Sequence, residues 1–112
     1  MRKYETKEVQ RAKLKELVGT GKISCSAKFT KGRKYDGSLE GLRLLLDVII
    51  HLKEGKKLHI HHLWIKNKPE YYGRYIGKNL DFTAMVETYG LEGKARLTDV
   101  YFKKYVRKLY NT

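Results

Sequence analysis

Three of the chain's four histidines stand together in a segment with the composition of a β-strand, and their spacing could support metal chemistry. The segment Leu58–Ile65 reads LHIHHLWI. Because side chains alternate along a strand, we expect His59 and His61 on one face and His62 on the other. Two neutral imidazoles side by side can ligate a divalent cation, and a third ligand would complete a site able to polarise a scissile phosphate. The competing interpretation is that these are surface histidines of a basic protein.

A second group of reactive side chains lies near the C-terminus, where the pattern Tyr-x-x-Lys occurs twice, as Tyr101 with Lys104 and Tyr105 with Lys108. On a predicted helix Val100–Tyr110, both tyrosines and Lys108 share a face. A tyrosine that attacks a phosphodiester must lose its phenolic proton, and a neighbouring ammonium favours the phenolate. The alternative is a helix that packs its apolar residues inward and exposes its charges.

A third group mixes aromatic and basic side chains. Aromatic faces stack on unpaired bases, while cations follow the phosphates. The residues expected to line such a nucleic-acid groove are Lys31, Arg33, Lys34, Lys56, Lys57, Lys66, Lys68, Tyr71, Tyr72, Arg74, Tyr75 and Lys78. Alternatively, the tyrosines cover a sheet edge and the lysines form a solvated surface.

The charge balance favours a polyanionic partner. Twenty-five Lys and Arg face twelve Asp and Glu, a formal net charge of +13 on 112 residues. A compact state with this imbalance repels itself unless a polyanion or counterions offset it, and a phosphate backbone is the usual partner. We therefore expect nucleic acid, with single-stranded DNA favoured. Binding to a membrane surface is disfavoured, because it calls for a basic amphipathic helix carrying Trp, Phe and Leu, whereas the single Trp64 lies in a predicted strand.

Other features place the chain among cytoplasmic proteins, of a cell or of a virus-infected host. No apolar run approaches the roughly 18 residues of a spanning helix, and the polar start Met1–Gln10 predicts no signal peptide. The single Cys25 excludes an internal disulfide framework and is expected to be a buried thiol. A chain of this size with a modest core could form a homodimer, the commonest soluble assembly.

The elements that must position these residues follow from hydrophobic periodicity and turn signals. Glu40, Arg43, Asp47 and His51 are spaced three, four and four apart, which predicts one solvent-exposed stripe on an otherwise buried helix, capped by Ser38. The predicted helices are Thr6–Val18, Leu39–Lys53, Leu80–Tyr89 and Val100–Tyr110. The predicted strands, in chain order, are Lys22–Thr30, Leu58–Ile65, the Tyr-rich Tyr71–Ile76 and Lys94–Leu97. Basic loop Lys31–Gly37 and turn Glu54–Lys57 separate them.

This order of elements predicts one small α+β domain over residues 1–112, with an N-terminal helix in 1–18 and a core in 22–110. The expected architecture is an antiparallel sheet covered by helices. We expect a ferredoxin-like core.

Taken together, the motifs resemble those of the HUH endonucleases, the rolling-circle replication initiators and related single-strand transposases and relaxases. The family's histidine–hydrophobic–histidine motif would be His59-Ile60-His61, and its tyrosine would be Tyr101 or Tyr105, with Lys104 or Lys108 on the phosphate. Phe29-Thr30 is similar to the end of an earlier strand motif. The resemblance implies a Mg²⁺- or Mn²⁺-dependent nick of single-stranded DNA that leaves tyrosine on the 5′ phosphate. It implies His59 and His61 as metal ligands, with Glu87 or Asp47 as candidates for a third.

Two other functions stay open. Leu63–Phe82 is similar to the acetyl-CoA-binding segment of GNAT acetyltransferases, where a strand runs into a glycine-rich turn and a helix whose amides hold the pyrophosphate. Gly73 and Gly77 match that pattern, whereas Tyr72 and Tyr75 depart from it, and both glycines also suit simple turns. The remaining alternative is a non-enzymatic DNA- or RNA-binding protein of a phage or mobile element, including an inhibitor of a host nucleic-acid enzyme.

Overall fold

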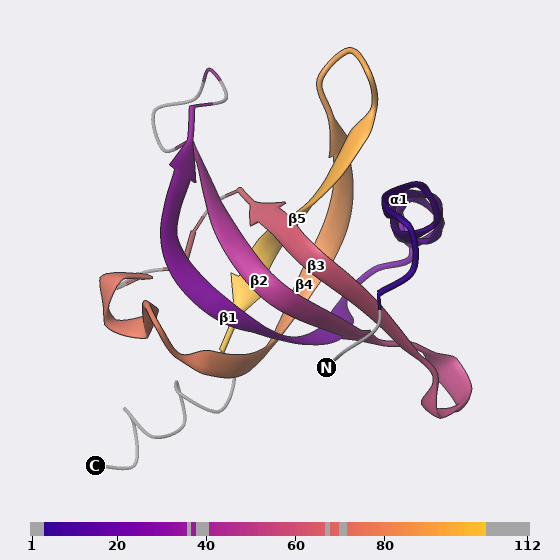
Figure 1. The fold of residues 1–112 in the computed structure, drawn as a ribbon, viewed down its shortest axis with the longest axis horizontal. Helices are drawn as coiled ribbons and strands as arrows, with labels where there is room; N and C mark the ends of the chain where they lie inside the picture. The colour runs from indigo at the N-terminus through magenta and orange to yellow at the C-terminus, as the bar shows by residue number, and fades with distance from the viewer. Residues whose placement is uncertain (1–3, 36, 38–40, 67, 70–71, 103–112) are drawn as a thin grey trace.

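The computed structural model describes residues 4–35, 37, 41–66, 68–69 and 72–102, and these form five strands, one α-helix and two short 3₁₀ helices. Figure 1 shows the strands wrapped into a barrel with the α-helix outside it. In chain order the elements are α1 (Lys7–Lys15), β1 (Ile23–Lys34), β2 (Leu42–His51), η1 (Lys53–Gly55), β3 (Lys57–Ile65), η2 (Tyr72–Tyr75), β4 (Asn79–Tyr89) and β5 (Lys94–Tyr101).

The strands close into a barrel in the order β1-β2-β3-β5-β4, so the predicted ferredoxin-like sheet covered by helices is wrong. Neighbouring strands are antiparallel except β3 and β5, which pair in parallel at Ile65 and Leu97. Pairing of β1 with β4, from Ile23 opposite Ala84 to Lys28 opposite Asn79, closes the barrel. Five-stranded Greek-key barrels include the OB-fold, which is partly open, whereas this barrel is closed. Strand order alone assigns no function.

An aromatic cluster around Phe29 fills one part of the barrel interior. The Phe29 side chain is fully buried, and its ring centroid lies 5.4 Å from Phe102, 5.5 Å from Phe82 and 5.7 Å from Tyr72. Aliphatic side chains complete the core, among them Leu42, Leu45, Val48, Ile50, Ile65 and Leu97. Each aromatic pair contributes about 0.5–1.5 kcal/mol beyond the area it buries. Because side chains pack the interior, binding surfaces must be sought outside the barrel.

The segment predicted as helix Leu39–Lys53 is strand β2, and a β-bulge explains the error. Ser26 pairs with Ile49 and Lys28 with Leu46, so β2 contains one more residue than β1 over this stretch. Asp47 lies in the extra position with φ 51°. The bulge changes the alternation, so that Leu45 and Val48 are both fully buried although they are three residues apart. This spacing mimics the period of a helix.

Two other predicted helices are also strands where the structure describes them. The segment Leu80–Tyr89 belongs to β4, whose Leu80, Phe82, Ala84 and Val86 alternate on the buried face. Of the predicted helix Val100–Tyr110, the first two residues are the end of β5. The rest of that segment, from 103 on, and the predicted cap Ser38 lie outside the described residues.

Other elements follow the sequence more closely. The helix predicted over Thr6–Val18 is α1, and the Thr6 hydroxyl oxygen accepts a hydrogen bond from the Val9 amide at 3.3 Å as its N-cap. The strands predicted over 22–30, 58–65 and 94–97 are confirmed, although β1 continues through most of the predicted loop 31–37. The strand predicted over 71–76 is wrong, because Tyr72–Tyr75 forms η2.

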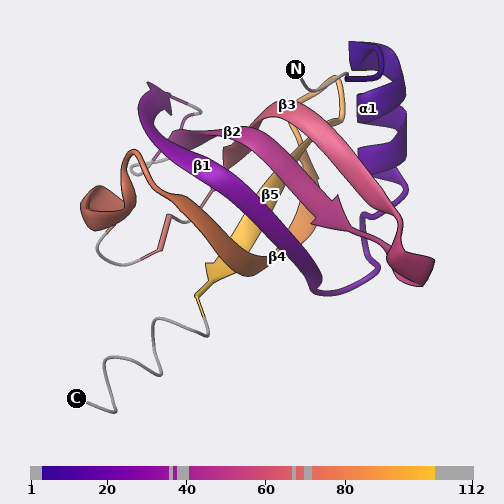
Figure 2. The ribbon, with the colours of Figure 1, turned by 60° about the horizontal axis from the view of Figure 1, so that its bottom comes forward.

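Helix α1 stands beside the barrel along β3 (Figure 2) and contacts β3, β4 and β5. Leu14 is its buried apolar anchor, and the side-chain oxygen of Gln10 accepts a hydrogen bond from the His61 amide at 3.2 Å. The helix is thereby fixed to the strand that carries the histidines. Within the described part of the chain, no helix is long and apolar enough to cross a membrane.

Candidate nucleic-acid interface

The histidine strand differs from the predicted arrangement. In β3, Ile60 and Leu63 are both buried although they are three residues apart, which leaves His61 and His62 exposed together. Their Nδ1 atoms lie 3.3 Å apart. His59, by contrast, is half-buried, and its Nδ1 is enclosed with no hydrogen-bond partner among the described residues. The structure therefore brings His61 together with His62.

The two candidates for a third metal ligand are engaged elsewhere. Glu87 Oε1 accepts a hydrogen bond from Arg96 Nε at 2.7 Å, and Asp47 Oδ1 accepts one from the Tyr4 hydroxyl. Among residues 4–102, as far as the structure describes them, no group of three or more His, Cys, Asp or Glu side chains is placed to hold a metal ion. Metal binding by His59 and His61 stays a prediction.

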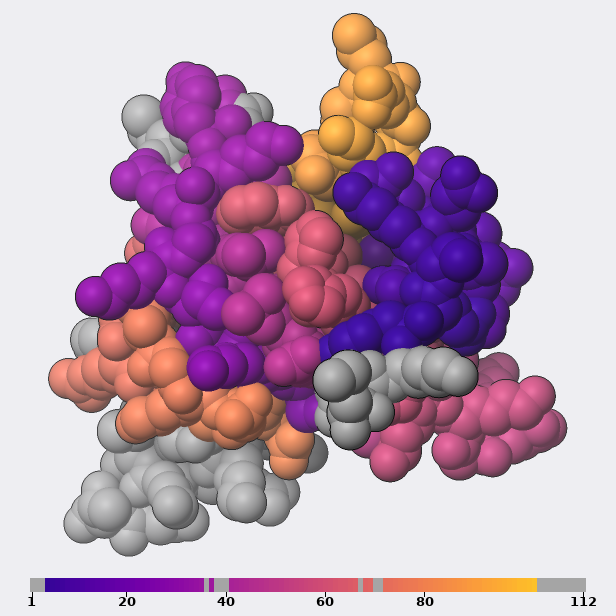
Figure 3. Space-filling model, viewed as in Figure 1, coloured from indigo at the N-terminus to yellow at the C-terminus, as the bar shows by residue number. Residues whose placement is uncertain are grey.

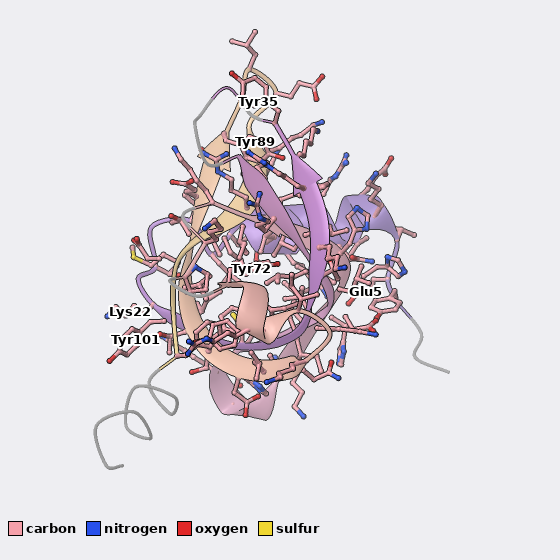
Figure 4. The ribbon with its side chains drawn as sticks, turned by 90° about the vertical axis from the view of Figure 1, so that its left-hand side faces the viewer. Glu5, Lys22, Tyr35, Tyr72, Tyr89 and Tyr101 are labelled. Atoms are coloured by element: carbon pink, nitrogen blue, oxygen red, sulfur yellow. The ribbon has the colours of Figure 1, made fainter. Side chains whose placement is uncertain are left out.

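Tyr101 lies away from the histidines. The parallel strands β3 and β5 meet at the point where Ile65 pairs with Leu97. His61 lies four residues before Ile65 in β3, and Tyr101 lies four residues after Leu97 in β5. At about 3.3 Å per residue, each is about 13 Å from that point, on opposite sides of it. Figure 4 shows Tyr101 at the end of β5, far from Tyr35 and Tyr89. The partner residues Lys104, Tyr105 and Lys108 lie outside the described part of the chain.

Two of the tyrosines predicted to stack on bases belong to the core. Tyr72 is 5% exposed, and its hydroxyl donates a hydrogen bond to the Thr30 carbonyl at 2.8 Å. Burial raises the pKa of the Tyr72 phenol, although the Thr30 hydrogen bond and the charge of Arg43 oppose the rise. The ring of Tyr75 packs 4.6 Å from that of Phe102. The Tyr72 ring is therefore not available to a nucleic acid, and half-buried Tyr75 packs against the core.

The predicted basic residues do not form one groove. Lys56 and Lys57 lie at the β2–β3 connection, which projects away from the β4–β5 connection in Figure 1. Lys31, Arg33, Lys68, Arg74 and Lys78 are exposed, and Tyr71 lies outside the described residues. Lys34 and Lys66 lie together on a surface that the sequence did not define.

The segment compared with acetyltransferases lacks the helix that the comparison requires. Gly73 lies in η2 and Gly77 just after it, and the chain then enters strand β4 at Asn79. No helix begins after these glycines within residues 72–102, so no helix N-terminus is available there for a pyrophosphate.

Lys34 and Lys66 belong to a groove formed by two adjoining hollows that share Lys34 and Tyr89, with volumes of about 490 Å³ and 410 Å³. The larger hollow lies between α1, β3 and the β4–β5 connection, and the smaller between the ends of β1 and β4 (Figure 3). The cations that line the two are Lys7, Arg11, Lys15, Lys34, Lys66, Lys94 and Arg96. One carboxylate, Glu92, lines them among the described residues. We call this surface the basic groove.

Three aromatic side chains line the basic groove. Half-buried Trp64 lies in the larger hollow, Tyr89 lies in both, and Tyr35, 76% exposed, lies in the smaller. Figure 4 shows Tyr35 and Tyr89 at the same end of the molecule. The glycines at both ends of the β4–β5 turn, Gly90 and Gly93, have φ of 72° and 66°, which favours glycine.

The guanidinium group of Arg96 packs against the ring of Tyr89. Its guanidinium carbon lies 4.4 Å from the centroid of the Tyr89 ring, and its Nε is 2.7 Å from Glu87 Oε1. Arg96 is 6% exposed, so the ion pair holds a nearly buried charge against the ring. A cation on one face of an aromatic ring is attracted by its quadrupole, which fixes the ring. Tyr89, which lines both hollows, is thereby held in place.

The electrostatics of the groove disfavour a further cation. Partial burial lowers the pKa of His62, and the charges of His61, Lys7 and Arg11 lower it further. The same field favours an anion such as a phosphate.

Sequence reasoning missed Trp64, Tyr89, Arg96 and the α1 cations as parts of this surface. They come from α1, β3 and the β4–β5 hairpin, which meet only when the barrel closes. A local signal existed for the hairpin, because Tyr89-Gly90 and Gly93-Lys94 separate two segments with alternating apolar residues.

Compared with known proteins, the chain matches no protein-family model, no curated protein and no solved structure.

Proposed function

We propose that this protein is a binding module for single-stranded nucleic acid, which it holds in the basic groove. The observation that supports the proposal most directly is the composition of the two adjoining hollows, which among the described residues are lined by seven cationic side chains, one carboxylate and three aromatic rings. A positively charged groove follows the phosphates, and aromatic faces stack on successive bases of any sequence. The five-stranded barrel adds only an analogy, because the OB-fold binds oligonucleotides and oligosaccharides on the face of strands 2 and 3 and on the loops β1–β2 and β4–β5.

The aromatic rings favour a single strand over a duplex. Trp64 and Tyr89 can stack only on bases that are not already stacked in a helix, whereas a duplex would use the cations alone. The groove is also bounded by α1 on one side and by the β4–β5 connection on the other. A nicking step is no part of the proposal.

The proposal is tested by the salt dependence of binding to labelled oligothymidylate, measured by fluorescence anisotropy. If the six cations other than the nearly buried Arg96 contact phosphates, log Kobs falls with log salt with a slope of about −4, since each contact on a single strand contributes about −0.7. The variant with Arg11→Gln and Lys34→Gln should bind more weakly, with a slope smaller by about 1.4.

The matched control removes two charges outside the groove, with Lys28→Gln and Lys53→Gln. Both lysines are exposed, and their replacement lowers the net charge by two, as the groove variant does. The control should keep the wild-type slope. An equal loss of slope in both variants would show diffuse attraction to a basic surface, and tighter binding to a duplex would contradict the preference for single strands. Absence of salt-sensitive binding to any oligonucleotide would overturn the proposal.

A further inference from the structure

The exposed pair His61 and His62 lies on the wall of the basic groove, opposite the cations of α1. Both histidines line the larger hollow together with Lys7 and Arg11. With their Nδ1 atoms 3.3 Å apart, the two neutral rings can share one hydrogen bond, in which one Nδ1–H donates to the other Nδ1. If both nitrogens of both rings are protonated, two positive charges face each other at this distance. An anion between the pair and α1 would relieve that repulsion.

The charged groups around the pair come from every element that packs there. Helix α1 contributes Lys7, Arg11 and Lys15, and the β4–β5 connection contributes Lys94 with Glu92, whose side chains are 3.6 Å apart. From β2, Asp47 accepts the hydrogen bond of Tyr4, whose ring is 5.4 Å from that of His61. Carboxylates, lysines and arginines do not change charge between about pH 5.5 and 8, whereas histidine does.

We propose that His62, beside His61, forms a proton-coupled contact for a backbone phosphate of the bound strand, so that binding takes up a proton from solvent. This inference rests on the proposed function and names one phosphate position within it. A phosphodiester placed between the pair and Lys7 or Arg11 brings a negative charge to the His62 imidazole and stabilises its protonated form. By linkage, the free energy by which the phosphate stabilises the protonated histidine appears as tighter binding at low pH.

The expected effect has a definite sign and size. In the free protein, burial and the neighbouring cations keep the pKa of His62 below its ordinary value. If the bound phosphate raises that pKa, the affinity increases as pH falls through the interval between the two values, by up to about a factor of ten for each pH unit of that interval. Above that interval the histidine is neutral in both states, and the affinity no longer changes with pH.

The test measures binding of oligothymidylate, with a label that does not respond to pH, from about pH 8 to 5.5 at constant salt. Neither the phosphodiesters nor the thymine bases titrate in this range. The wild-type protein should bind several-fold to about tenfold more tightly at the low end. His62→Gln should lose most of this dependence, because glutamine cannot gain the charge. The matched control is His51→Gln, an exposed histidine at the end of β2 that does not line the groove.

A titration of the histidine ring protons by NMR, with and without oligothymidylate, gives a second readout. A rise in the pKa of His62 on binding supports the inference. An affinity that is constant across the range, or equal pH dependence in wild type and His62→Gln, overturns the proton-coupled contact while groove binding stands. Absence of binding at every pH overturns both the inference and the proposed function.

Discussion

Replacement of Trp64 tests whether bases stack in the groove, and the chain's single tryptophan is also its own reporter. Stacking of a base on an aromatic side chain contributes about 1–3 kcal/mol. Trp64 is half-buried, beside Leu44 on β2, so only part of the indole is open to a base. We therefore take the lower end, about 1 kcal/mol, which corresponds to about fivefold weaker binding for Trp64→Leu.

The assay combines anisotropy of a labelled oligonucleotide with the emission of Trp64. Addition of oligothymidylate should quench the indole emission, and added salt should restore it as the strand dissociates. Trp64→Phe keeps an aromatic face and should lose less affinity than Trp64→Leu, while both variants keep the wild-type salt slope. Unchanged affinity in Trp64→Leu, together with unquenched emission in the wild type at saturation, would refute base stacking at this position. Phosphate contacts would then be the main source of affinity.

Two further predictions concern the barrel. Burial raises the pKa of the Cys25 thiol to about 12 from 9.0. The thiolate population near pH 8 is therefore about a thousandfold smaller than in the unfolded chain, so a thiol reagent such as DTNB should react only after denaturant is added. Rapid reaction of the native protein would mean that β1 is open in solution. Phe29→Ala should lower the free energy of unfolding by about 3–5 kcal/mol, because the ring is fully buried among four other aromatic rings. Urea denaturation measures the loss, and Tyr35→Ala, at an exposed ring, should change the value by less than about 0.5 kcal/mol.

The sequence predicted elements where one physical signal dominates. Helix α1 has a capping threonine and one apolar face, and β1 and β3 are rich in alternating or β-branched residues. The expected burial of Cys25 is confirmed.

The wrong elements are those in which tertiary structure overrides local preference. The bulge at Asp47 gives β2 a helical spacing of buried residues, and only the pairing with β1 reveals the extra residue. In β4, the helix-favouring residues Ala84, Met85 and Glu87 conceal an alternation that is complete in the structure. A fold class built on these two segments could not be right.

The place of the candidate site was not predictable from the sequence. Lys34 and Lys66 were among the expected contacts, and the predicted polyanionic partner stays a prediction. Tyr72 and Tyr75 looked available because nothing local shows that η2 folds back over Phe29. The sequence predicted His59 and His61 on one face, whereas the structure exposes His61 and His62 together, because the alternation of buried and exposed residues in β3 breaks between Ile60 and Leu63.

Closure of the barrel also constrains how the chain folds. The β1–β2 and β2–β3 pairings are between neighbours in sequence, whereas the closing pair joins Ile23 to Ala84, and the parallel pair joins Ile65 to Leu97. Bringing together distant segments costs loop entropy before any contact compensates for it, so chains dominated by such pairings fold in milliseconds to seconds. The meander β1–β2–β3 can form early, and β4 and β5 dock later on both of its edges. Because the basic groove needs α1, β3 and the β4–β5 hairpin together, it comes into existence only in that last step, and a nascent chain that has not yet folded to this stage lacks it.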